Sequence, residues 1–99
     1  MKGKMTAVFL AVSSLTALNA HAYDGSRYES NASVKMDQAK AIALKAYPGT
    51  IVEESLEKKH GKLHYAFDIR AHHVTHEVAV DASSGKVLQN SRETEKDDD

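Results

Sequence analysis

The sequence of 99 residues has no cysteine and no tryptophan, only one proline, and no excess of charge of either sign. Without cysteine there can be no disulfide, thiolate metal site, thiol nucleophile or cysteine-linked lipid anchor. The 13 Lys and Arg nearly balance the 14 Asp and Glu, which leaves a formal net charge of −1. A sequence-independent nucleic-acid binder needs a basic stripe to displace counterions, so we expect no nucleic-acid partner.

Residues 1–22 have the pattern of a secretion signal peptide. A basic start is followed by an uncharged, largely apolar run of 13 residues over 6–18, and Ala20-His21-Ala22 closes the segment as an A-x-A cleavage box. We therefore predict cleavage between Ala22 and Tyr23. The apolar run is shorter than the about 20 residues that a membrane helix needs, so we expect no membrane span after cleavage. The mature chain is predicted to be periplasmic or secreted.

Two polar segments flank a central region with regular apolar patterning. Residues 23–33 are rich in polar residues and show no apolar period, which predicts a flexible lead-in. Residues 90–99 contain several acids and end in three consecutive aspartates, which predicts an acidic, disordered tail. The structured domain is therefore expected over residues 34–89.

A helix is predicted between Met36 and Tyr47, where apolar residues recur at three- and four-residue steps. Four alanines among these twelve residues favour the helix and keep its buried face thin, so that it can lie close to a sheet. Pro48-Gly49 ends the helix, because proline lacks an amide N–H and disfavours helical geometry in the residue before it.

Beyond Gly49 the apolar period changes from about 3.6 residues to about 2, which indicates strands. The clearest alternation covers residues 63–70, and weaker alternation occurs over 50–58 and 77–81. Lys86-Val87-Leu88 predicts a short fourth strand. The expected fold class is α+β, with one N-terminal helix packed on a three- to four-stranded antiparallel meander sheet.

The first hairpin register follows from a two-residue turn at His60-Gly61. This turn places Leu56 opposite Tyr65, and Val52 opposite Ile69. These pairs put the apolar side chains of both strands on one face, as they must, because a slip of one residue would invert a strand.

The second hairpin register is predicted from a four-residue loop over residues 72–75. This loop places Ile69 opposite Val78 on the apolar face. On the other face it places Arg70 opposite Glu77, which is a favourable cross-strand pair.

His72, His73 and His76 lie in or beside the second predicted hairpin loop. Neutral imidazoles bind zinc, copper or nickel, and three of them within five positions on a turn can converge on one ion. They are the candidate transition-metal site. The alternative is an exposed polar loop in which histidine is tolerated. No other cofactor is expected.

Enzyme signatures are incomplete in this sequence. His76-Glu77 begins like the zinc-protease H-E-x-x-H motif, but Val80 stands where the second histidine is required. There is no G-x-S-x-G nucleophile motif and no glycine-rich phosphate loop. We therefore predict that the protein is not an enzyme, and we assign no catalytic residue.

Three segments together resemble the PepSY domain. They are Met36–Gly49 with its helix followed by Pro-Gly, Gly61–Ile69 with its Gly-Lys-Leu-x-Tyr start, and Val80–Leu88 with its Asp-x-x-x-Gly-Lys-Val-Leu ending. The resemblance covers about residues 34–89. This family includes inhibitory propeptides of thermolysin-type metallopeptidases and many free-standing exported proteins. Its motifs are structural and bring no catalytic residues to this chain.

Two functions stay open at this point. The resemblance implies a non-enzymatic regulator or inhibitor that binds an envelope or secreted protein, such as a peptidase or a sensor protein. The alternative is sensing or buffering of a metal or small ligand through the loop of His72, His73 and His76. The sequence predicts neither the partner nor the oligomeric state.

Overall fold

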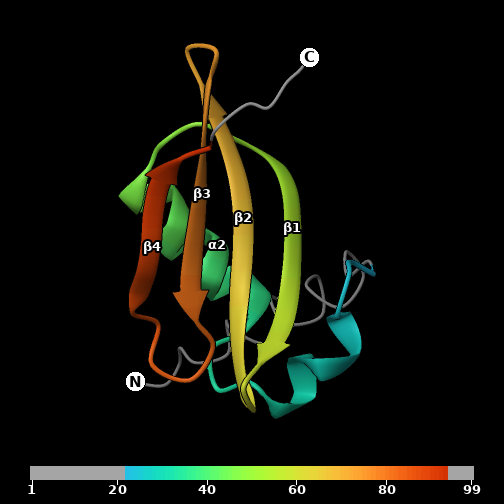
Figure 1. Ribbon diagram of the computed structural model, residues 1–99. Helices are drawn as coiled ribbons and strands as arrows, with labels where there is room; N and C mark the ends of the chain where they lie inside the picture. The colour runs from blue at the N-terminus through green and yellow to red at the C-terminus, as the bar shows by residue number, and fades with distance from the viewer. Residues whose placement is uncertain (1–21, 94–99) are drawn as a thin grey trace, which may run out of the picture.

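In the computed structural model, which describes residues 22–93, an α-helix packs on one face of a four-stranded antiparallel sheet (Figure 1). The strands follow one another in the order β1-β2-β3-β4, which is a meander. The predicted α+β class is confirmed. The elements are the 3-10 helix η2 (Ser26–Asn31), α2 (Met36–Ala46), β1 (Thr50–Lys59), β2 (Lys62–Ala71), β3 (Val74–Asp81) and β4 (Val87–Arg92).

The predicted signal peptide lies almost entirely outside the described residues. Ala20 is not among them, whereas Ala22 and Tyr23 are. Within residues 22–93, no helix has the length and apolar character needed to cross a bilayer.

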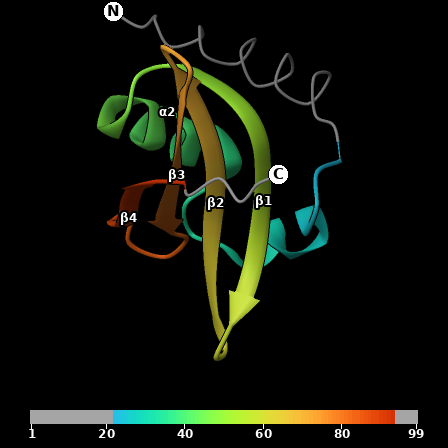
Figure 2. The ribbon, with the colours of Figure 1, turned by 45° about the horizontal axis from the view of Figure 1, so that its top comes forward.

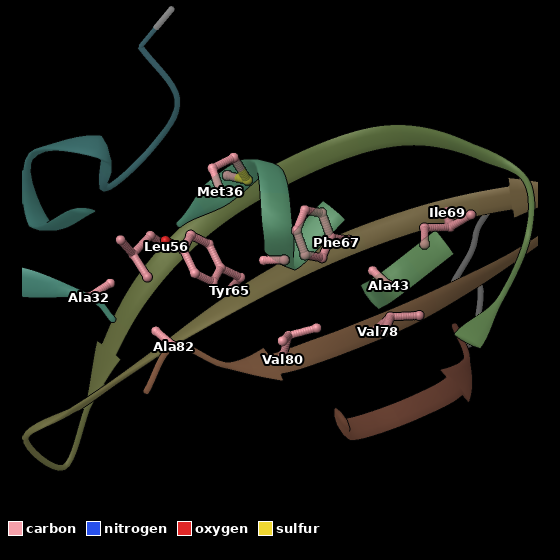
Figure 3. Packing of buried hydrophobic residues seen from close by; sticks show 11 residues of the cluster. Ala32, Met36, Ala43, Leu56, Tyr65, Phe67, Ile69, Val78, Val80 and Ala82 are labelled. Atoms are coloured by element: carbon pink, nitrogen blue, oxygen red, sulfur yellow. The ribbon is translucent and has the colours of Figure 1, made fainter. Parts of the chain in front are cut away.

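The core lies between α2 and the sheet (Figure 3). Tyr65, Phe67 and Ile69 alternate along β2 and are at most 1% exposed, as the period-2 pattern predicts. The helix contributes small side chains, so it lies close to these larger ones. The buried cluster comprises Ala32, Met36, Ala39, Ala43, Leu56, Tyr65, Phe67, Ile69, Val78, Val80 and Ala82.

The segment before α2 is ordered, although its composition predicted a flexible lead-in over residues 23–33. It contains η2, and the backbone N–H of Leu56 donates to the carbonyl of Asp24 at 2.9 Å, which fastens the segment to β1. Glu29 accepts from the backbone N–H of Met36 at 2.9 Å. The carboxylate of Glu29 therefore caps the start of α2, where the helix dipole favours negative charge.

In the first hairpin, the predicted pairing of Leu56 with Tyr65 is confirmed. The predicted pairing of Val52 with Ile69 was wrong. Ile51 lies opposite Ile69, and the register shifts between Ile51 and Glu53. A β-bulge at Val52 takes up the extra residue, which leaves its side chain 56% exposed.

The second hairpin also differs from its predicted register. His72 and His73 form a two-residue turn with φ of 51° and 67°, so the four-residue loop was wrong. Two successive positive φ angles give a turn whose twist matches the flanking strands. Phe67 therefore lies opposite Val78, and Asp68 lies opposite Glu77. The register has moved by two residues, which leaves the same side chains on the buried face.

The fourth strand is longer than predicted. It runs from Val87 to Arg92, so it includes residues that composition assigned to the tail over 90–99. Pairing with β3 accounts for the extension, since Val78 lies opposite Asn90 and Glu77 lies opposite Ser91. The remaining part of the predicted tail, residues 94–99, lies outside the described residues.

Candidate functional site

The face of the sheet opposite α2 is the most distinctive surface of the described chain. Figure 2 shows α2 on one side of the sheet only, with the other side free of any helix within residues 22–93. Glu53 of β1 lies opposite Asp68 of β2, which in turn lies opposite Glu77 of β3. We call these three residues the acidic row. Within the part of the chain that the structure describes, none of the three forms an ion pair.

The charges of the acidic row act on one another. The pKa of Asp68 rises to about 6, first because the carboxyl is partly buried, and then because of the charge of Glu93, a side-chain hydrogen bond with Glu53, and the charges of Glu53 and Glu77. Like charges placed directly opposite each other destabilise a sheet. The row therefore costs the isolated domain stability at neutral pH.

A shallow hollow of about 250 Å³ lies beside the acidic row. Asp24, Ser55 and Glu57 contribute to its lining together with members of the row. At its margin, His64 Nε2 lies 3.3 Å from Glu57 Oε1. The hollow therefore extends the negative surface across β1, toward the lead-in that is fastened to that strand.

Replacing Asp68 with asparagine is expected to stabilise the protein at pH 7.5 by about 1 kcal/mol, after allowance for screening by solvent. In the native protein the folded pKa of Asp68, about 6, lies above its ordinary value of 3.8. Between these two pH values the folded state holds a proton that the unfolded state has lost. Stability therefore falls as pH rises through this window. Asparagine removes that titration.

Urea unfolding of both proteins between pH 4 and pH 8 checks this expectation. The native protein should lose stability across the window relative to Asp68→Asn. The amide of the variant keeps the size of the side chain and can still donate to Glu53. Parallel stability curves for the two proteins would contradict the assignment.

The three histidines of the candidate metal site are not brought together. His72 and His73 are exposed at the tip of the β2–β3 hairpin. His76 lies on the helix-facing side of β3, where its ring stacks on Tyr47 with centroids 3.8 Å apart. Its Nδ1 also hydrogen-bonds Oδ1 of Asn90 at 2.8 Å.

No group of three or more His, Asp or Glu side chains within residues 22–93 is arranged to hold a metal ion. The geometry therefore gives the transition-metal hypothesis no support. Metal binding by His72, His73 and His76 stays a prediction.

The acidic row was not found from the sequence, although its residues were visible there. The predicted second hairpin placed Arg70 opposite Glu77, which would have neutralised the row. In the structure Arg70 lies opposite Thr75 instead. A prediction of a two-residue turn at His72-His73, in place of the four-residue loop, would have put Asp68 opposite Glu77.

Comparison with protein families confirms the resemblance found in the sequence. The PepSY family, described as the peptidase propeptide and YPEB domain, matches residues 34–89. This range contains α2, β1, β2 and β3 in full, together with the beginning of β4. Comparison with curated proteins and with solved structures gave no match.

Proposed function

Because the chain belongs to the PepSY family, we propose that it is a non-enzymatic module that regulates or inhibits a partner protein. PepSY modules are of the propeptide and inhibitor type rather than catalytic domains. The partner is a peptidase or another envelope or secreted protein. The signal-like pattern of residues 1–22 supports export to the periplasm or the medium.

The observation that carries this proposal is the acidic row on the open face of the sheet. Glu53, Asp68 and Glu77 are held opposite one another at a cost in stability, with no ion pair among the described residues. Local arrangements that lower stability without an evident compensation are typical of functional sites. A partner that brings lysine or arginine to this face would remove the repulsion.

The partner surface is therefore basic. Complementary charge accelerates encounter and gives specificity, and its effect is screened by salt. Binding should weaken at high ionic strength. It should also weaken below about pH 6, because Asp68 then takes up a proton and the row loses charge.

A capture experiment tests this function. The purified protein is immobilised and exposed to the secreted or periplasmic fraction of its host, and retained proteins are identified by mass spectrometry. The variant Glu53→Gln/Asp68→Asn/Glu77→Gln neutralises the row with side chains of nearly equal size. Asp37→Asn serves as the matched control, because Asp37 is exposed in the first turn of α2, away from the row.

We expect a peptidase or envelope protein to be retained by the native protein and by Asp37→Asn, and to be lost with the triple variant and at high salt. A retained peptidase should change its hydrolysis rate when equimolar native protein is added. Equal retention by all variants would contradict the role of the acidic row. Recovery of no protein at low salt would contradict the function itself.

A further inference from the structure

A second feature lies at the end of the sheet that carries the β1–β2 turn. It is a cavity of about 470 Å³ between η2, the β1–β2 hairpin and the loop that follows β3. Its volume falls within the range of about 300–1,000 Å³ that is usual for small-molecule sites. The lining includes Tyr28, Lys58, Lys62, Leu63, Asp81 and Ala82. None of these residues belongs to the acidic row.

The hairpin beside this cavity is strongly basic. Lys58, Lys59 and Lys62 lie around the turn at His60-Gly61, and Lys59 is directly opposite Lys62. Like charges in that position are destabilising. In the described part of the chain neither Lys58 nor Lys62 forms an ion pair with a carboxylate. Two cations therefore line the cavity, and the charge of one of them, Lys62, already acts on Asp81 and helps to lower its pKa.

Tyr28 forms an aromatic wall of the cavity next to the basic hairpin. Lys58 Nζ lies 5.8 Å from the centre of the Tyr28 ring, and the guanidinium carbon of Arg27 lies 4.7 Å from it. Cations at these distances interact with the face of the ring. Tyr28 lines the cavity, so its ring offers apolar surface to a ligand beside these basic groups.

The acid in the cavity limits the charge of the ligand. The Asp81 carboxylate accepts from Ser83 N–H at 2.7 Å, Ser83 Oγ at 2.8 Å and Ser84 N–H at 3.3 Å. The Ser83 backbone hydrogen bond is the largest cause that lowers the pKa of Asp81, so this carboxylate stays charged at neutral pH. Two lysines and one aspartate give the lining a charge of 2 − 1 = +1. A monoanion balances that charge, whereas a phosphate dianion does not.

The walls also require an apolar body on the ligand. Leu63 and Tyr28 are half-buried beside the cavity, and Ala82 is buried. We propose that this cavity binds an organic monocarboxylate, with its carboxylate at Lys58 and Lys62 and its apolar part against Tyr28 and Leu63. A free small acid and the carboxyl terminus of a peptide share this chemistry. This site is independent of the function proposed for the acidic row.

Titration of the purified protein, followed by amide chemical shifts at constant ionic strength, tests the proposal. The probes are N-acetyl-phenylalanine, its neutral amide N-acetyl-phenylalaninamide, and inorganic phosphate. We expect saturable shifts for the acid at the amides of Gly61, Leu63 and Ser83, which line the cavity. The neutral amide and phosphate should give none. Binding of either as tightly as the acid would overturn the proposal.

Two further arms distinguish the source of the carboxylate. An N-acetyl tripeptide that ends in phenylalanine is compared with the same tripeptide amidated at its C-terminus. Tighter binding of the free-acid tripeptide than of N-acetyl-phenylalanine assigns the site to peptide termini. Equal or weaker binding assigns it to small acids. In either case, the amidated tripeptide should not bind.

Charge variants locate the site. Lys58→Gln and Lys62→Gln are each expected to weaken binding of N-acetyl-phenylalanine about fivefold, the effect of losing one solvent-exposed ion pair. Lys45→Gln removes the same charge from the last turn of α2 and should leave affinity unchanged. Unchanged affinity in both hairpin variants would overturn the assignment.

Discussion

Replacing Phe67 with alanine is expected to leave most of the protein unfolded at neutral pH. Phe67 is 1% exposed in the middle of β2, opposite Val78, and its ring lies 6.4 Å from that of Tyr65. Truncation of a buried phenylalanine costs about 3–5 kcal/mol, because transfer energy is lost and a cavity remains. A domain of this size has about 3–5 kcal/mol of stability in total. The expected loss is therefore about as large as the whole free energy of unfolding of the native protein.

Circular dichroism in the far ultraviolet, followed during urea titration, checks this expectation. Val52→Ala is the matched control, because Val52 is also a large apolar residue of the sheet but is 56% exposed at the bulge. Its stability should change by no more than about 0.5 kcal/mol. A Phe67→Ala protein that unfolds at the native urea concentration would contradict the placement of the core.

The core could be predicted from the sequence because strand side chains alternate between faces. Tyr65, Phe67 and Ile69 follow one another at every second position, so burying any one of them buries the others. The alanines of α2 were equally informative, since only small side chains let a helix approach these rings closely. The fold class follows from these two local patterns.

The acidic row could not be predicted in the same way. The predicted and observed registers of the second hairpin differ by two residues, and both bury the same side chains. Hydrophobic pattern therefore cannot choose between them. The choice rests on the turn, where His72 and His73 both adopt positive φ, a conformation that is uncommon for residues other than glycine. Arg70 was consequently assigned to Glu77, the position that Asp68 occupies.

The order in the lead-in was missed for a different reason. Residues 23–33 show no apolar period, and periodicity records only local pattern. Their order comes from contacts with later segments. Glu29 caps α2 through Met36, and Lys35 Nζ donates to the carbonyl of Ala32 at 2.7 Å beside that cap. The cap forms only once the helix is in place, and the hydrogen bond from Leu56 N–H to Asp24 forms only once β1 is in place.

Replacing Gly25 with alanine is expected to release this lead-in from β1. Gly25 has a φ of 86°, and a Cβ at this position would lie 1.8 Å from the carbonyl oxygen of Leu56. The atoms of Leu56 that this Cβ would meet all belong to the backbone, so no side-chain movement relieves the overlap. The hydrogen bond from Leu56 N–H to Asp24 should break, and the cap that Glu29 provides should be lost with it. We expect a loss of at least about 2 kcal/mol, made up of left-handed strain and the missing contacts.

Gly61→Ala separates the two causes of that loss. Gly61 has a φ of 78°, but a Cβ there would meet no atom within 4 Å. This control therefore carries the conformational strain without the overlap, and should cost about 1 kcal/mol. Hydrogen exchange at the Leu56 amide should accelerate in Gly25→Ala and stay slow in Gly61→Ala. Equal stability losses and equal exchange in the two variants would mean that left-handed strain alone acts at Gly25, and that the lead-in is not held by its close approach to β1.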